Sequence, residues 1–400
     1  MLRKTLLFGL VLLPFYEFII YILMPAGRIP EWIDFRVTKE YIAIGLALIV
    51  TALVWKEVKK IECPNMWTLW FLVFMFFNLS KSPIAVANPI VDLSLLGRFS
   101  AEFKVFTFFL MFCTVSSIKF SDRFIEKIFF TLFVGAIVMS FYMILQALNL
   151  DQILKPKDAY LLGEVKGVRV AGFFGQPTLA VPYLLMGIPF AVYFKKIWGV
   201  IVIGIAALLT GSDFAIVGLA LIFGIYSIGK KRMMVVSGIA FVGCLILYAL
   251  KPDKLFFDNG RFLAWGMILE DVFSGKINGV DVRIGLFGAG LNNFGEMFTA
   301  LHTSAYTRAH NEFLQVLWCC GVVGEAIFVM INFEVFKTAW SVVRDNRAKT
   351  LAISLVAIVF CSMGTFVFQL GAYQFFTVLI VALIYQLKNQ NTGDMSCLNY

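Results

Sequence analysis

Only two histidines occur in the chain, and both lie in a polar, glycine-rich stretch that precedes an apolar run. His310 is the last loop position before that run, and Asn311 is a residue type favoured at a helix N-cap. The positive end of a helix dipole disfavours another positive charge, so we expect the His310 imidazole to be neutral near pH 7. A neutral imidazole can act as a general base, although a histidine that only hydrogen-bonds a helix entrance would have the same spacing. We favour His310 over His302, which we expect to be a bystander or a supporting group.

Four loop arginines are candidates for binding phosphate: Arg169, Arg261, Arg283 and Arg308. A guanidinium group presents a planar fork of donors that matches phosphate oxygens, and a lipid-linked diphosphate is the ligand that would need it at a membrane surface. Each arginine taken singly could instead contact lipid headgroups. That alternative fits less well where an arginine lies in a glycine-containing stretch at the entrance of an apolar run. Asn311 is a further candidate for binding substrate.

The other titratable residues predict neither a metal site nor a cofactor site. Cysteine, histidine and carboxylate residues lack the spacing of metal ligands, and the sequence has no nucleotide-binding loop. Glu17 and Glu325 lie within apolar runs, and Asp213 lies at the edge of one. A lipid-exposed charge at the bilayer centre costs about 2.5–3.5 kcal/mol, so we expect each carboxylate to face other helices and to have a partner.

The composition indicates that helices in a membrane position these groups. Apolar residues make up 60% of the 400 residues, charged residues make up 15%, and the mean hydropathy is +0.86. A soluble globular chain is about half apolar and a quarter charged. We therefore expect an all-α integral membrane protein that forms one polytopic domain over residues 1–400.

Runs of about 17 to 25 apolar residues are long enough to cross the hydrocarbon of a bilayer as helices. The sequence predicts about twelve such spans: 5–23, 39–55, 66–78, 100–118, 124–148, 174–194, 197–211, 213–229, 233–250, 311–336, 350–369 and 371–387.

The basic residues predict the orientation of these spans. With the N-terminus inside, short inside loops hold 18 of the 34 basic residues, as expected for cytoplasmic loops. This topology accounts for the net charge of +9 better than nucleic-acid binding does. Both termini are then cytoplasmic, and every long loop lies outside. The largest, 251–310, precedes the tenth span, and Trp265 and its apolar neighbours predict an amphipathic helix within it.

The helix that follows His310 also carries glycines at a regular spacing. His310 and Gly321 are eleven residues apart, which is about three helical turns, so they share a face that also includes Gly324 approximately. Glycines on one face allow a neighbouring helix to approach closely. We therefore expect this helix to be held against a partner helix.

Four motifs, in order along residues 165 to 330, resemble those of the O-antigen ligase/polymerase family of bacterial membrane glycosyltransferases. They are Arg169-x-x-Gly172-x-Phe174 with Gln176-Pro177, Leu209-Thr-Gly-Ser212, Gly260-Arg261-x-x-x-Trp265, and His310-Asn-x-Phe-Leu314 with Gly321-x-x-Gly324.

The resemblance implies a GT-C-like fold and an inverting, metal-independent transfer at the periplasmic face of the bacterial inner membrane. A glycan would move en bloc from undecaprenyl diphosphate to lipid A-core, or, in a polymerase, to a second carrier-linked glycan. His310 would assist deprotonation of the acceptor, and Arg261 with Arg169 would stabilise the diphosphate. The sequence departs from the family where Asp213 follows the Thr-Gly-Ser turn, because the family commonly has arginine there.

Two other classes of protein remain open. A multi-span transporter or flippase would need polar residues deep within several spans, whereas here the charges gather at the outer ends of the spans. A cell-wall polymerase would use a loop aspartate, either Asp271 or Asp281, in place of His310. Ligase and polymerase cannot be separated by these motifs.

Overall fold

The computed structural model describes residues 1–23, 35–55, 100–150, 157–161, 164–174, 176–227, 261–274, 276–277, 280–281, 284–290, 294–302, 308–365 and 367–392.

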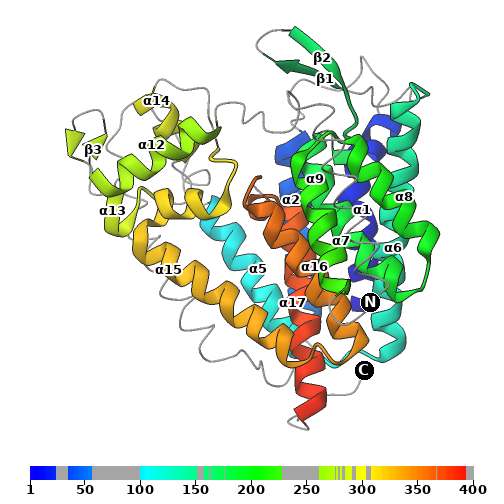
Figure 1. Ribbon diagram of the computed structural model, residues 1–400. Helices are drawn as coiled ribbons and strands as arrows, with labels where there is room; N and C mark the ends of the chain where they lie inside the picture. The colour runs from blue at the N-terminus through cyan, green and yellow to red at the C-terminus, as the bar shows by residue number, and fades with distance from the viewer. Residues whose placement is uncertain are drawn as a thin grey trace.

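A bundle of apolar helices makes up most of the described structure (Figure 1). Its helices are α1 (Leu2–Leu23), α2 (Phe35–Trp55), α5 (Ser100–Ser116), α6 (Asp122–Ala147), α7 (Pro177–Tyr193), α8 (Ile197–Leu209), α9 (Asp213–Ser227), α16 (Asn346–Ser362) and α17 (Gly371–Thr392). Their buried side chains form one continuous hydrophobic core. A further long helix, α15 (Glu312–Ser341), runs obliquely along one side of this bundle.

The expectation of a helical membrane protein is confirmed in its coarser form. Three helices are long and apolar enough to cross a membrane: Asp122–Ala147, Glu312–Ser341 and Gly371–Gln390. Five shorter apolar helices accompany them in the described residues. The spans predicted at 66–78 and 233–250 lie outside the described residues, so the number of twelve stays a prediction.

Two short antiparallel hairpins interrupt the helical pattern, so the described structure is not purely α-helical. The first pairs β1 (Lys157–Leu161) with β2 (Glu164–Arg169), and the second pairs β3 (Lys276–Ile277) with β4 (Val280–Asp281). Both lie in predicted outside loops. In β2, polar and apolar residues alternate only from Glu164 to Lys166, and Val168 breaks the period of a strand, so the sequence gives little signal for this hairpin.

Contacts between the helices define two opposite ends of the bundle. At one end, Nη1 of Arg347 in α16 lies 2.5 Å from Oδ1 of Asp122 in α6, and the Arg3 guanidinium of α1 lies over the Phe124 ring. At the other end, the amide of Gly172 donates to Oε1 of Gln146 at 2.8 Å. The predicted inside residues therefore gather at the first end, and the β1–β2 hairpin lies at the second (Figure 1).

A smaller group of elements packs on the first half of α15, at the same end of the bundle as the β1–β2 hairpin (Figure 1). It consists of α12 (Arg261–Ser274), α13 (Ile284–Phe287), the π-helical turn η3 (Phe294–Phe298) and α14 (Thr299–His302), and we call it the loop module. A helix is confirmed in the predicted position as α12, but several of its apolar side chains are exposed. It buries Ala264 and Ile268, whereas Phe262 and Leu263 are exposed.

Gly321 breaks α15 rather than continuing it. Its φ of 69° and ψ of −176° are not helical, and φ lies in the left-handed region that favours glycine. The break leaves the carbonyls of Trp318 and Cys319 free to accept hydrogen bonds from the amides of Ala289 and Gly290, at 3.1 and 2.6 Å. Gly321 permits the close approach of a neighbouring helix, as expected, and that helix is the short α13 of the loop module.

A Cβ atom on Gly321 would lie 2.3 Å from backbone atoms of Leu286 and Phe287. The glycine therefore joins the loop module to the long helix, and it does so eleven residues after His310. The other glycine expected on this face, Gly324, is buried. The expectation for Glu325 is wrong in one respect, because its Oε2 is buried without a hydrogen-bond partner among the described residues. The side chain of Glu17 lies outside the described residues.

Candidate functional site

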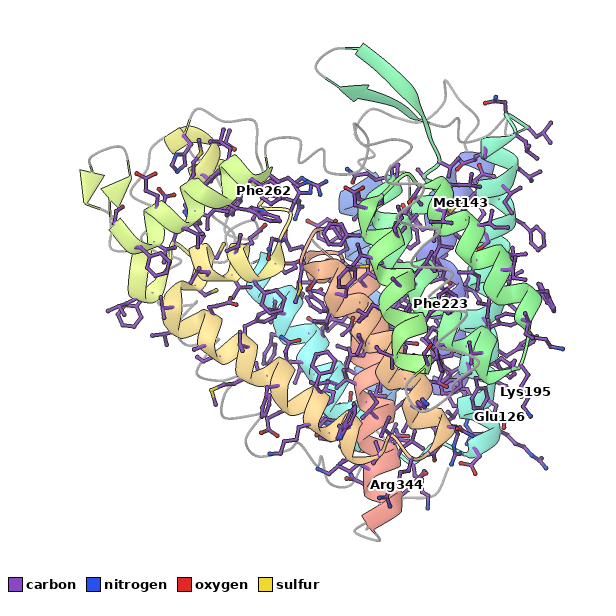
Figure 2. All side chains as sticks on the ribbon, in the orientation of Figure 1. Glu126, Met143, Lys195, Phe223, Phe262 and Arg344 are labelled. Carbon is purple, nitrogen blue, oxygen red and sulfur yellow. The ribbon has the colours of Figure 1, made fainter. Side chains whose placement is uncertain are left out.

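The candidate site lies where four parts of the chain meet at one end of the bundle. These are the first turn of α12, residues 308–312 at the start of α15, the segment from the end of α16 through η4 (Val367–Gln369), and the first half of α5. In Figure 2, the side chain of Phe262 in the first turn of α12 lies near this junction, while Arg344 lies at the opposite end. Each part contributes at least one polar side chain.

His310 has a left-handed backbone, with φ of 53°. Few residues other than glycine adopt this conformation, although histidine does so more often than most. The residues on both sides of it are anchored. Ala309 donates its amide to Oε1 of Gln315 at 3.1 Å, and Oδ1 of Asn311 accepts from the amide of Leu314 at 3.2 Å. The predicted N-cap is therefore confirmed, and the fixed backbone positions the imidazole before the first turn of α15.

Trp265 explains the spacing of the Arg261 motif. Its indole Nε1 donates to the carbonyl of Ala309 at 2.7 Å, beside His310. Arg261 lies four residues earlier on α12, so both side chains share one face of that helix. The Arg-x-x-x-Trp pattern thus ties the helix to the histidine segment with one residue and presents a guanidinium group with the other.

Burial and two positive charges control the protonation of His310. Burial is the larger cause, and the charges of Arg261 and Arg308 add to it, so that the pKa of His310 falls from its usual 6.5 to about 4. The imidazole is therefore neutral at pH 7, as the sequence predicts. The causes that the structure shows are desolvation and the two guanidinium groups, which lie within electrostatic reach of the ring.

Arg261 also connects the site to the start of α9, the helix that follows the Thr-Gly-Ser turn. Its Nη1 donates to the carbonyl of Gly364, just after α16, at 3.3 Å. Gly364 packs so closely on Phe214 that a Cβ atom there would overlap the Phe214 ring. Phe214 follows Asp213 in the first turn of α9. The position at which the sequence departs from the motif of the resembled family is therefore next to a residue that packs on Gly364, the hydrogen-bond partner of Arg261.

A chain of hydrogen bonds holds Arg308 in place. Nη1 of Arg308 donates to Oε1 of Gln369. The backbone amide of Gln369 donates to Oε1 of Glu312 at 3.2 Å, and the side-chain Nε2 of Gln369 donates to Oε2 of Glu312 at 3.0 Å. Glu312 is buried, and Nζ of Lys104 donates to the backbone carbonyl of Gln369 at 2.5 Å. The carboxylate therefore fixes the amide of Gln369, which in turn presents its oxygen to the arginine.

The structure brings together four of the six predicted site residues: His310, Arg261, Arg308 and Asn311. Arg169 is the last residue of β2, opposite Lys157, and its side chain lies outside the described residues. Arg283 lies outside them altogether.

Sequence reasoning assigned no role to Glu312, Gln369 or Lys104. Glu312 had a signal, since it follows His310 by two residues and is a carboxylate at the entrance of an apolar run. Gln369 and Lys104 had none, because they join the site only through the packing of distant segments.

Asp271, the alternative catalytic residue, lies in a structural cluster. Its Oδ2 accepts from Nε1 of Trp318 at 2.9 Å and lies 2.8 Å from Nε2 of His302. The aspartate is 2% exposed and belongs to the packed interior of the loop module, where Phe298 lies against His302. His302 thus supports the module from within, as expected of a supporting group. The side chain of Asp281 lies outside the described residues.

In the described part of the chain, no group of three or more histidine, cysteine, aspartate or glutamate side chains could hold a metal ion. A scan against protein-family models and a search of curated proteins both find no match to this chain. The arrangement itself offers one neutral imidazole, two guanidinium groups that reach it, and a buried carboxylate that orders one of them. Such a set can accept a proton from a hydroxyl while binding an anion beside it.

Proposed function

We propose that this chain is a membrane glycosyltransferase that moves a glycan en bloc from an undecaprenyl-diphosphate carrier to an acceptor hydroxyl. The proposal includes a twelve-span topology in the bacterial inner membrane, with the site at the periplasmic face and both termini in the cytoplasm. The motifs from Arg169 to Gly324 support it by resemblance to O-antigen ligases and polymerases.

One observation carries the proposal: a neutral imidazole lies within reach of two cations that come from separate parts of the chain. Arg261 starts α12, and Arg308 precedes α15, so the loop module and the long helix must pack together to assemble the set. Two guanidinium groups suit the two phosphates of a diphosphate. A neutral histidine beside two arginines suits a reaction in which a hydroxyl loses its proton while a diphosphate leaves nearby.

The reaction would form one bond and break one. The acceptor oxygen attacks the anomeric carbon of the donor, and the bond from that carbon to the diphosphate oxygen breaks. The electron pair leaves with undecaprenyl diphosphate, and His310 takes the proton of the acceptor hydroxyl. Attack opposite the leaving group inverts the anomeric carbon.

Arg261 and Arg308 would stabilise the negative charge that develops on the diphosphate. Fixed donors aimed at developing charge in a partly dehydrated site are among the strongest catalytic effects. The guanidinium groups can supply the positive charge that a divalent ion supplies elsewhere, so we propose a metal-independent transfer. In this account Arg308 takes the second cationic role, for which the resemblance suggests Arg169.

The acceptor separates two forms of the proposal. Transfer to lipid A-core is the reaction of a ligase, and transfer to a second carrier-linked glycan is that of a polymerase. Our first proposal is the ligase. The polymerase is the close alternative, because the described side chains favour neither acceptor.

The test uses the purified full chain in vesicles that contain an undecaprenyl-diphosphate-linked glycan. Lipid A-core and a second carrier-linked glycan are supplied as acceptors in separate reactions, and covalent products are resolved by mass. We expect a product with one acceptor, and that acceptor identifies ligase or polymerase. Movement of the intact donor across the bilayer with no product would indicate a transporter or flippase and overturn the proposal.

A further inference from the structure

A basic cavity lies at the end of the bundle opposite the candidate site. It has a volume of about 510 Å³, within the range of roughly 300–1,000 Å³ that is usual for small-molecule sites. It lies between the start of α1 and the start of α6, where the two helices contact each other. Its lining residues are Arg3, Lys4, Leu7, Ser121, Arg123, Phe124 and Lys127. Four of these seven residues are basic, and no carboxylate lines the cavity in the part of the chain that the structure describes.

The four cations remain available to a ligand. Arg3, Lys4, Arg123 and Lys127 are exposed, and none of them forms an ion pair with another described residue. Asp122, a carboxylate beside the cavity, is engaged with Arg347 at 2.5 Å. An excess of basic residues at one end agrees with a cytoplasmic face. It does not by itself explain why four cations line one cavity with no acid among them.

The cavity also has the backbone polarity of an anion site. Both helices begin there, and the first amides of a helix have no partner within it. Ser121 is the N-cap of α6 and lines the cavity, and its hydroxyl makes no capping hydrogen bond. The ring of Phe124 lies 5.4 Å from the guanidinium carbon of Arg3, which holds that cation over an apolar floor.

An apolar surface continues from the cavity along both helices. On α1, Val11 is exposed one turn beyond Leu7, on the same face as Arg3. On α6, the exposed residues Phe130 and Val134 follow Lys127 at helical spacing. Cations at a helix end with an exposed apolar stripe beyond them match a molecule that joins an anionic head to hydrocarbon chains.

We propose that this cavity binds the phosphate headgroup of an anionic membrane phospholipid, with its acyl chains along α1 and α6. Basic pockets between helices at the cytoplasmic side commonly hold such headgroups. The site lies at the opposite end from His310 and does not depend on the proposed transferase activity. A free phosphate compound would use the same cations but would leave the apolar stripe unused.

The test measures lipid binding to the delipidated full chain in neutral detergent by native mass spectrometry. Phosphatidylglycerol and phosphatidylcholine with identical acyl chains are titrated separately. We expect tighter binding of phosphatidylglycerol, and a loss of about 30-fold in the double variant Arg123→Gln/Lys127→Gln, since each cation near anionic lipid contributes about 1 kcal/mol and 1.4 kcal/mol is tenfold. Phosphatidylcholine binding should not change.

The matched control is Lys195→Gln/Lys196→Gln, which removes two exposed cations that do not line the cavity. This control should bind phosphatidylglycerol as the unaltered chain does. Equal binding of the two lipids, or an equal loss in the control, would overturn the proposal. Inorganic pyrophosphate is titrated without lipid, and if it bound at the cavity as tightly as phosphatidylglycerol, a soluble phosphate would be the ligand and the lipid would not.

Discussion

The imidazole of His310 is affected by two arginine charges, so its protonation should respond to whatever those arginines bind. Without an anion, burial and the charges of Arg261 and Arg308 hold the pKa of His310 at about 4. A base with so low a pKa is weak at pH 7, and general-base catalysis is most effective when the pKa lies near the working pH. A bound diphosphate would offset the two positive charges and raise the pKa of His310 toward that range.

The first prediction follows for the pH dependence of transfer. The profile of kcat/KM reports the free enzyme, and the profile of kcat reports the complex with donor. The base form of His310 exists above its pKa, so rates fall as the pH drops through that pKa. We expect the acidic limb of kcat to lie at a higher pH than the acidic limb of kcat/KM. Coincident limbs, or an unchanged gap in Arg261→Gln, would contradict this electrostatic coupling.

The second prediction concerns the polarity of the hydrogen bonds that hold Arg308. In Glu312→Gln, one acceptor oxygen facing Gln369 becomes a donor, so either the backbone amide or Nε2 of Gln369 loses its acceptor, and the oxygen that Gln369 presents to Arg308 is held less firmly. Hydrogen bonds to charged groups contribute about 1.5–3 kcal/mol, so we expect the KM for donor to rise at least about tenfold.

The double variant Glu312→Gln/Gln369→Glu is the matched control for this prediction. In this variant the carboxylate at position 369 accepts from Arg308, and the amide at position 312 donates to that carboxylate. The net charge is the same as in the unaltered chain. The KM for donor should return most of the way to that of the unaltered chain. If both variants lose donor affinity equally, Glu312 does not act through Gln369.

At the scale of elements, the break in α15 holds the loop module on the long helix. The third prediction is that Gly321→Ala destabilises the protein by at least about 2 kcal/mol, because it combines a strained positive φ with a backbone overlap. Thermal unfolding of the purified protein measures it. Gly266→Ala in α12 is the control, since nothing lies within 4 Å of the added Cβ, and alanine there should be neutral or slightly stabilising. Equal midpoints for the two variants would show that the break carries no such constraint.

The elements also show where sequence reasoning stops. The long apolar runs and the N-cap at Asn311 follow from local physics, so those helices and the existence of α12 could be predicted. The break at Gly321 could not, because a glycine inside an apolar pattern is equally compatible with a continuous helix. The break is stabilised by residues about thirty positions earlier in the chain. The amides of Ala289 and Gly290 donate hydrogen bonds to the carbonyls that the break leaves free.

The same limit applies to the site. His310, Arg261 and Arg308 were predicted because cations and histidines are rare and conspicuous in an apolar chain. Gln369 was not, because an uncharged amide near the last span has no chemical signal until packing places it between Glu312 and Arg308. The β1–β2 hairpin was missed because the residues of β2 do not keep the polar and apolar alternation that is typical of a strand.

For the whole molecule, the two ends of the bundle differ in chemistry, and the proposed topology assigns them to opposite sides of the membrane. The fourth prediction uses Phe262→Cys in the loop module, where the side chain is 62% exposed, and Arg344→Cys at the other end (Figure 2). A membrane-impermeant thiol reagent should label residue 262 from the periplasm in intact cells.

Residue 344 should react only after the inner membrane is opened. Three of the described cysteines, Cys319, Cys320 and Cys361, are buried free thiols, and the unaltered chain serves as the background control. Labelling of both positions from the same side of the membrane would rule out the proposed topology.

The central claim is that His310 is the base in a transfer of glycan from a diphosphate carrier. The most direct measurement is the rate of covalent product formation by His310→Ala, with His302→Gln as the control histidine. The account predicts a loss of roughly 10²–10⁴-fold for His310→Ala, the range that a positioned base contributes. His302→Gln should keep its turnover, even if the loop module is less stable. Undiminished product formation by correctly inserted His310→Ala protein would contradict the account.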